Sequence, residues 1–515
     1  MINDRIRRAR LQRGLTLDAL AIQLGDITKQ ALSKYEKGLS TPNSTRLLQL
    51  AKALQVNPEY FFRSEAIPLA PLEFRKLAKM PKYRQAQVEE KIREHLERYI
   101  ALEECFDPAD INTPVTPAQM IAVSSIDEAE LAAEELRQFW GIGTDPIANL
   151  TEQLEEHSIK IAMLNGPDDF DGACATTGDG KHVLIALNAD RPGERIRFTA
   201  AHELGHWVMA LPEEMSEKDK ENCCHRFAGA FLYPAKSVTG DFGSHPRTRV
   251  HPQELLIAKR QYGISMHAAL RRLKDLKLLS EGGYKSLTIQ FSAKGWRKSE
   301  PEPMPCKPPQ RFESFSILGT GRRADYQIPG CRTLAQASKS PGPKFPGLIG
   351  ECMSLIYISD TNIWIDFRNA GLLEQMFRLP FTLCCTDFVM HELEDFPHDE
   401  LLDQGLIVES LDDASVMRLY GLRIEHNNSS LADVSCYLLA QQTRRPLLTG
   451  DGKLRRQAQR DGLQVHGALW LLDLMVEHHV IERLHAAEAL AHMLEHGARL
   501  PASECETRLS RWREP

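Results

Sequence analysis

The chain has 515 residues, 42% hydrophobic and 26% charged, which is ordinary for globular domains and excludes a wholly disordered protein. At roughly 100–200 residues per domain, this length predicts about three domains. The net charge of −7 excludes a protein that is basic throughout, yet residues 1–63 hold eleven Lys/Arg against five Asp/Glu. A basic end on an acidic chain predicts that this end alone binds a polyanion.

Membrane and secretory signals are missing from the sequence. The first ten residues are polar, and no segment reaches the ~18 apolar residues of a membrane helix, so we expect no membrane contact. The eleven cysteines include the adjacent pairs Cys223–Cys224 and Cys384–Cys385 but no C-x-x-C. Such pairs in apolar surroundings are typical of small buried side chains, and we expect reduced thiols in a cytoplasmic protein.

Turn-forming residues and changes of periodicity divide the chain into five parts. We expect an all-α domain first, an α+β domain in the middle and an α/β domain with a parallel sheet at the end. The segment from about 83 to 104 has helical apolar spacing within a charged connector, and prolines dominate the stretch before the last domain. The predicted parts are 1–66, the connector 67–123, the domain 124–300, the Pro/Gly-rich linker 301–352 and the domain 353–515.

Two short helices joined by three residues are predicted near the N-terminus. Thr16 can cap the first, Gly25 ends it, and Thr28 begins the second. Such a pair is a helix-turn-helix, whose second helix enters the major groove of double-stranded DNA. A basic helical bundle that binds nothing is the alternative. The candidates for contacts with phosphates and base edges are Thr28, Lys29, Gln30, Ser33 and Lys34.

This region resembles the Xre/Cro-type helix-turn-helix family. The resemblance rests on Ser33-Lys34-Tyr35-Glu36-Lys37-Gly38, Pro42, and Leu47, Leu50, Ala51, Ala53 and Leu54. It implies binding to a double-stranded DNA operator. The family usually has a phosphate-contacting Gln after the capping Thr, where this chain has Leu17. We therefore expect Lys29 and Gln30 to make more of the contacts with DNA. Proteins that contact DNA bases through one recognition helix usually dimerise to bind two half-sites. The charged connector helix is a candidate homodimer surface.

The middle domain carries the motif H-E-x-x-H at His202 to His206. The i, i+4 spacing places both imidazoles on one helix face, with Glu203 beside the open metal position. A catalytic zinc site needs a third protein ligand, for which Glu221 on the next helix is the first choice and His225 the reserve. An ordinary amphipathic helix is the alternative, and we expect Cys223 and Cys224 to pack rather than to bind metal.

Residues 130–300 resemble the ImmA/IrrE family of metallopeptidases. The match includes Phe170-Asp171-Gly172, the run from Arg195 to His206, Glu221, the run from Arg226 to Pro234, and the segment from Gly295 to Pro301. The resemblance implies Zn²⁺ held by His202, His206 and Glu221, with Glu203 as general base. It also implies a protein substrate, such as a helix-turn-helix repressor, this chain's own front end or its linker. A degenerate, catalytically silent fold is the alternative.

Acidic residues follow the strand-like runs of the last domain. Asp360, Asp433 and Asp451 could each be a helix cap or turn residue, and Glu392 lies in helix-like text. In an open α/β sheet, however, function gathers at the carboxyl ends of strands, where several carboxylates can hold Mg²⁺ or Mn²⁺. The basic side chains nearby that could contact a nucleic-acid backbone are Arg444, Arg445, Lys453, Arg455 and Arg456.

This domain resembles the PIN-domain ribonucleases. The matching segments are Asp360-Thr361-Asn362, Glu392-Leu393, Leu431-Ala432-Asp433 and Leu448-Thr449-Gly450-Asp451. The resemblance implies that Asp360, Glu392, Asp433 and Asp451 bind Mg²⁺ or Mn²⁺ for cleavage of RNA. Met353 stands directly before the first strand, so we expect residues 353–515 to fold alone.

The sequence therefore predicts a DNA-binding transcriptional regulator with a zinc-dependent peptidase domain, of toxin–antitoxin or phage-repressor type, fused to a metal-dependent PIN-like ribonuclease. One alternative is a DNA-binding repressor in which both catalytic centres are silent. Another is a ribonuclease toxin with a fused antitoxin.

Overall fold

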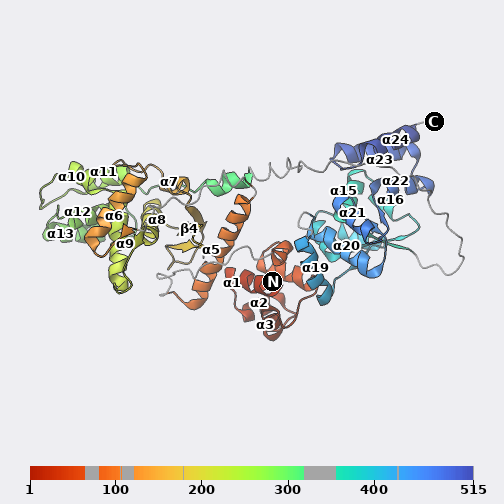
Figure 1. Cartoon of the computed structure of the whole chain (residues 1–515), viewed down its shortest axis with the longest axis horizontal. Coiled ribbons are helices and arrows are strands. Elements are labelled where there is room, and N and C mark those ends of the chain that lie inside the picture. Colours follow the sequence, from red (N-terminus) through yellow and green to blue (C-terminus); the bar gives the residue numbers. More distant parts are fainter. Residues whose placement is uncertain are drawn as a thin grey trace. The chain divides into compact units, whose positions relative to one another are not determined.

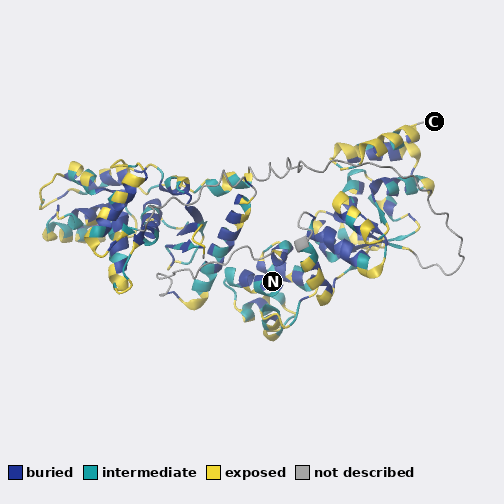
Figure 2. Cartoon of the chain, in the orientation of Figure 1, coloured by how far each residue is buried: buried dark blue, intermediate teal, exposed yellow. Residues whose placement is uncertain are grey.

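The computed structural model describes residues 1–63, 80–104, 106, 121–177, 179–317, 355–425 and 429–513. The chain divides into two compact units (Figure 1): residues 1–64 with 333–515, and residues 65–332. Figure 2 shows buried residues running through the interior of each unit. Among the described residues, no helix is long and apolar enough to cross a membrane.

The N-terminal domain consists of short helices, as predicted. The Thr16 hydroxyl accepts a hydrogen bond from the Ala19 amide at 3.1 Å, and Thr28 accepts one from Ala31 at 3.3 Å, so each Thr caps the helix that follows it. Gly25, with φ of 81°, ends the first of the two helices. The elements are α1 (Ile2–Gln12), α2 (Leu17–Leu24), α3 (Lys29–Glu36), α4 (Ser44–Leu54) and the 3₁₀ helix η1 (Pro58–Phe62).

The C-terminal domain is built on a five-stranded, all-parallel sheet in the order β10-β9-β6-β7-β8, which confirms the predicted α/β class. The strands are β6 (Ile356–Ser359), β7 (Thr382–Thr386), β8 (Ile407–Glu409), β9 (Leu447–Leu448) and β10 (Val465–His466). The helices are α15 (Thr361–Asn369), α16 (Leu373–Met376), α17 (Asp387–Glu392), α18 (His398–Asp403), α19 (Asp413–Glu425), α20 (Leu431–Thr443), α21 (Gly452–Arg460), α22 (Ala468–Glu477), α23 (Arg483–Glu495) and α24 (Ala502–Arg513).

The helix-turn-helix domain packs directly on this sheet domain. Ser44, at the start of α4 and fully buried, donates a hydrogen bond to Asp387 Oδ2 at 2.7 Å. Its oxygen also accepts the Leu411 amide at 2.7 Å, and the Phe62 and Phe388 rings meet edge to face at 6.1 Å. The hydrophobic residues of both domains form one continuous core. The first and last domains of the sequence therefore make a single folded body.

This junction predicts a stability effect at Ser44. Replacing Ser44 by Ala leaves the Asp387 carboxylate and the Leu411 amide without the hydroxyl, which we expect to cost about 2 kcal/mol. Hydrogen–deuterium exchange should become faster in α4 and α17 together. Ser40→Ala, a neighbouring substitution away from the junction, should leave both rates unchanged. Faster exchange in α4 alone would show that the two domains are not coupled.

The second unit contains the middle domain. Its three-stranded sheet has the order β2-β4-β3, with β2 parallel and β3 antiparallel to β4, which fits the predicted α+β class. The strands are β1 (Ile121–Ala122), β2 (Lys160–Leu164), β3 (Gly172–Thr176), β4 (Val183–Asn188) and β5 (Met209–Ala210). The helices are α5 (Lys82–Glu103), α6 (Ile126–Phe139), α7 (Leu150–Glu156), α8 (Gly193–Val208), α9 (Glu217–Leu232), α10 (Ala235–Phe242), α11 (Pro252–Tyr262), α12 (Met266–Asp275) and α13 (Glu281–Ala293).

The connector helix α5 is part of this unit. Its apolar residues Val88, Ile92 and Leu96 are buried in a cluster with Ala162 and Leu184 of the sheet. This apolar face is therefore already covered within the chain, and the homodimer surface on the charged connector helix stays a prediction.

The predicted linker also differs in part from expectation. Its first residues pack on the middle domain, because the amides of Gln310 and Arg311 donate to the Glu155 carboxylate at 3.0 and 3.2 Å. The remainder of the predicted linker, from residue 318, lies outside the described residues.

Candidate functional sites

Helices α8 and α9, which pack side by side (Figure 1), bring the predicted zinc ligands together. The His202 and His206 Nε2 atoms lie 3.1 Å apart. Glu221 Oε2 is 3.4 Å from His202 Nε2, and Glu221 Oε1 is 3.3 Å from His206 Nε2. The i, i+4 spacing on α8 and the first turns of α9 thus converge on one point.

These three distances are close to the ligand–ligand spacing of a zinc site, and the two Glu221 distances end on different oxygens of its carboxylate. Ligands about 2.0–2.1 Å from a tetrahedral zinc stand about 3.3–3.4 Å from one another. Two imidazole nitrogens and one carboxylate also form a donor set found in catalytic zinc sites. The residues present therefore fit a zinc ion with one position left for water or substrate.

The surroundings of Glu221 differ from those of His225, the second candidate for the third ligand. Burial raises the pKa of the Glu221 carboxyl, but its hydrogen bonds to His202 and His206 outweigh burial and bring the pKa far below its usual range. His225 can also join, because one of its ligand atoms lies within 4.8 Å of those of His202 and Glu221. However, its side chain is exposed and stacks on Phe198 at 6.0 Å. Glu221, by contrast, contacts the Nε2 atoms of both histidines. Cys224 also forms a metal-capable group with His202 and His206, since one ligand atom of each lies within 4.8 Å of the others.

Two further residues border this centre. Glu203 is only 4% exposed, next to His202 on α8. Cys224 is fully buried, as the packing interpretation predicts, but its sulfur also lies 3.4 Å from His206 Nδ1. This is the ring nitrogen that does not face Glu221, so Cys224 is placed to orient the imidazole. The expectation that Cys224 serves packing alone was incomplete.

The predicted carboxylates of the last domain occupy the carboxyl ends of its strands. Asp360 follows β6, Asp451 lies just after β9, Glu392 ends α17 after β7, and Asp433 lies in the first turn of α20. Asp360 caps α15 by accepting the Ile363 amide at 3.0 Å. The helix-capping alternative is therefore correct for Asp360 as a local description.

Asp451 likewise caps α21, where its Oδ1 accepts the Lys453 amide at 2.7 Å, but capping does not account for Asp433. Asp433 is 5% exposed, and its Oδ1 is buried without a hydrogen-bond partner among the described residues. Burial raises the pKa of Asp433, and the charges of Asp360, Glu392 and Asp451 raise it further. Burial also raises the pKa of Asp360. Four carboxylates that repel one another around a bare oxygen fit a divalent cation.

The carboxylate oxygens of this acidic site lie farther apart than the ligand atoms of the histidine site. Within the part of the chain that the structure describes, no three of these carboxylates bring one oxygen each within 4.8 Å of one another. Mg²⁺ usually keeps several water ligands and needs only one or two protein carboxylates. Glu392 is exposed and its Oε2 accepts the Thr361 hydroxyl at 2.7 Å, which places it at the rim.

Sequence reasoning missed Asp366, which joins this charged site. Burial, followed by the charge of Asp360, raises the pKa of Asp366 to about 6. Asp366 lies six residues after Asp360, and its position in a helix-like segment was the only feature of the sequence that could have indicated it. Of the basic candidates, Arg444, Lys453 and Arg456 are exposed. Arg445 forms an ion pair with Glu409, so it is less available for RNA.

Of the predicted DNA-contacting residues, Thr28, Lys29 and Gln30 lie at the start of α3, and Ser33 and Lys34 lie in its second half. Thr28, Lys29, Gln30 and Lys34 are exposed, and Ser33 is half-buried. Lys29 forms an ion pair with Asp18 at 2.6 Å, but both side chains are more than half exposed. A surface pair of this kind contributes only ~0–1 kcal/mol, so Lys29 remains available to a phosphate.

Comparison with known families matches all three domains. Residues 6–61 match the helix-turn-helix model, residues 155–274 the model of the IrrE N-terminal-like domain, and residues 356–514 the PIN domain. The three resemblances noted in the sequence are confirmed, and the matches follow the predicted three-domain architecture.

Individual proteins that the chain resembles match it over a short segment. An uncharacterized HTH-type transcriptional regulator of Sinorhizobium fredii is 39% identical over 61 residues, which is 12% of this chain and 42% of the relative. One of Rickettsia prowazekii is 41% identical over 61 residues, again 12% of this chain and 46% of the relative. The chain thus spans less than half the length of these relatives.

Proposed function

We propose that the chain is a DNA-binding transcriptional regulator whose middle domain is a zinc-dependent peptidase and whose last domain is a Mg²⁺- or Mn²⁺-dependent ribonuclease. The observation that carries the proposal is the triangle formed by His202, His206 and Glu221, with sides of 3.1, 3.4 and 3.3 Å. A packing histidine pair has no need of a carboxylate at both imidazoles. The matching family models support the same assignment.

The peptidase reaction assigns separate roles to neighbouring residues. His202, His206 and Glu221 would hold zinc, which lowers the pKa of water and polarises a carbonyl. Glu203 would accept the proton of the attacking water and pass it to the leaving amine as the peptide bond breaks. Cys224 would hold the His206 ring in place through Nδ1.

The ribonuclease reaction would use the acidic site. Asp360, Asp433 and Asp451, with Glu392 at the rim, would hold the divalent cation, which stabilises charge on the phosphodiester and activates water. Exposed Arg444, Lys453 and Arg456 on the same domain would contact the RNA backbone.

A second candidate function is a ribonuclease toxin carrying its own antitoxin. The observation that favours it is the core shared by the helix-turn-helix and PIN domains. The short helix α17 carries both the docking residue Asp387 and the proposed ligand Glu392. A domain docked there is in a position to restrain the acidic site.

Metal analysis of the purified full chain tests the main proposal. We expect one zinc per chain after desalting, together with binding of Mn²⁺ when the latter is added. A chain that holds no zinc would exclude the peptidase, and one that ignores Mn²⁺ would exclude the ribonuclease.

DNA recognition is expected to depend on Lys29 and Gln30. Replacing both by Ala should weaken binding to the operator by roughly tenfold to a hundredfold, since a single base contact, here that of Gln30, is worth ~1–3 kcal/mol. Lys29→Ala alone should lower the salt dependence of binding by about one unit if it contacts a phosphate. Fluorescence anisotropy with a labelled operator at several salt concentrations measures both quantities.

Lys37→Ala is the matched control, because Lys37 is exposed at the opposite end of α3. It should leave operator specificity unchanged. Unaltered operator binding by the Lys29/Gln30 double variant would discard the assignment of this helix to the major groove.

A further inference from the structure

A large cavity adjoins the proposed zinc site. Its volume is about 980 Å³, and Phe198, Asn222 and His225 form part of its wall. Phe198 precedes His202 by one turn on α8, and His225 follows Glu221 by one turn on α9. A chain seated in the cavity would therefore reach the proposed metal centre past His225.

The lining of the cavity is predominantly cationic. It includes seven Arg or Lys side chains against three Asp or Glu, with the aromatic walls Phe198, Tyr284 and Trp296. Aromatic walls with cations at fixed positions suit an extended chain that carries negative side chains.

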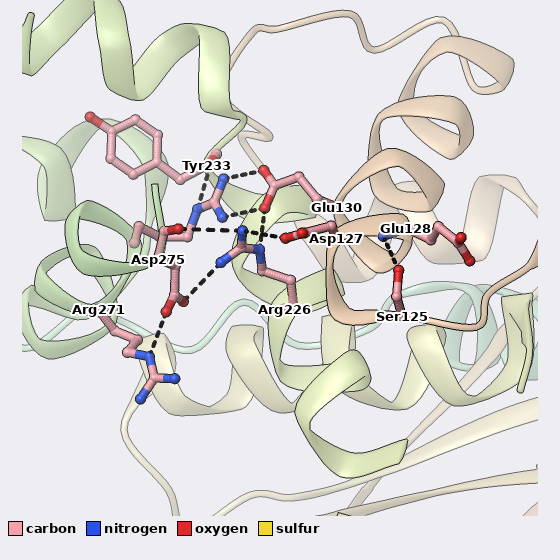
Figure 3. Close-up of polar contacts among 9 residues, drawn as sticks. Ser125, Asp127, Glu128, Glu130, Arg226, Tyr233, Arg271 and Asp275 are labelled. Carbon is pink, nitrogen blue, oxygen red and sulfur yellow. Dashed lines mark hydrogen bonds and ion pairs between the residues drawn. The ribbon is translucent and has the colours of Figure 1, made fainter. Parts of the chain in front are cut away.

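Some of these cations are held in place by ion pairs with carboxylates (Figure 3). Arg272, only 2% exposed, donates to both Glu130 oxygens at 2.6 and 2.7 Å, and Arg226 pairs with the same carboxylate at 2.6 Å. Arg226 and Arg271 both contact Asp275, at 3.6 and 2.8 Å. Arg226 also contacts Asp127 at 3.6 Å, so these three guanidinium groups are matched by three carboxylates.

Other groups in the lining have no such partner. Arg297 and Lys298 are exposed, and among the described residues neither has an acidic side chain within ion-pair distance. His267 Nδ1 is buried and accepts no hydrogen bond from any described residue. These groups offer a polar ring nitrogen and two cations to a ligand in the cavity.

We propose that this cavity binds an acidic segment of the peptide substrate and positions the neighbouring bond at the zinc site. The inference rests on the proposed peptidase function and adds the class of substrate.

Charge also bears on two candidate substrates within this chain. Residues 1–63 hold eleven Lys/Arg against five Asp/Glu, and residues 301–352 hold seven against four. Both segments carry a net positive charge, which argues against either of them as the acidic segment, and we expect that segment on a separate protein.

The test is a binding measurement with the full chain carrying Glu203→Gln, which prevents cleavage. Fluorescein-labelled decapeptides rich in Glu, in Gln or in Lys are titrated and followed by anisotropy. We expect the Glu peptide to bind on the order of tenfold tighter than the Gln peptide, with the advantage shrinking at high salt. Reversing two cations with Arg297→Glu and Lys298→Glu should remove that preference.

The matched control reverses two exposed lysines of the same unit outside the cavity, Lys218→Glu and Lys285→Glu. It should retain the preference. Equal binding of Glu and Gln peptides, equal loss in the control, or tighter binding of a ten-nucleotide single strand would each overturn the inference. Cleavage of peptides without regard to charge by the unmodified chain would overturn it while leaving the peptidase intact. Selective binding without any cleavage would overturn only the peptidase.

Discussion

Glu203→Gln is expected to keep one zinc per chain and to lose peptide cleavage. A glutamine side chain has nearly the shape of glutamate but cannot accept a proton, so the loss should reach at least the 10²–10⁴-fold typical of a missing general base. The ligands His202, His206 and Glu221 are untouched by the change. Zinc content by mass spectrometry and cleavage of a peptide library by the purified full chain measure the two effects.

His206→Ala is expected to lose both zinc and cleavage. One vertex of the triangle disappears, and two protein ligands do not retain a catalytic zinc through desalting. His245→Ala, at an exposed histidine of the same unit, is the control and should retain both. Stoichiometric zinc in His206→Ala would show that the metal binds elsewhere, and His225→Ala would then be the next variant to measure.

The elements that the sequence predicted best are those with local signals. The caps Thr16 and Thr28 and the H-E-x-x-H helix follow from residues within four positions of one another, where helical geometry alone decides what faces what. The connector helix was predicted correctly in extent, and its apolar face packs on the β2–β4–β3 sheet. Periodicity identifies a buried face but not the surface that buries it.

Long-range contacts were beyond the sequence. Ser44 and Asp387 are separated by 343 positions, and neither belongs to a recognised motif. Cys224 contacts the imidazole of His206 only because α8 and α9 lie side by side. The expectation that residues 353–515 fold alone must now allow for this: without the first domain, Asp387 loses the Ser44 hydroxyl and Phe388 the ring of Phe62.

The other prediction with a large expected effect concerns the metal dependence of stability at the acidic site. Because buried carboxylates repel one another when no cation is present, Mn²⁺ should raise the melting temperature of the full chain. Asp433→Asn removes one of those charges and is expected to make the metal-free chain more stable while abolishing the stabilisation by Mn²⁺. Differential scanning fluorimetry with and without Mn²⁺ measures both changes.

The same variant should lose ribonuclease activity by roughly a hundredfold or more, since a loss of ~3 kcal/mol of transition-state stabilisation corresponds to that factor. Asp395→Asn is the control, because Asp395 is exposed three residues after Glu392. It should keep both the thermal shift and the activity. If Asp433→Asn degraded RNA as fast as the unmodified chain, or gained the same stabilisation from Mn²⁺, the buried oxygen of Asp433 would not be a metal ligand. A metal-free chain destabilised by Asp433→Asn would show that the carboxylate serves the fold, because relief of repulsion requires the opposite sign.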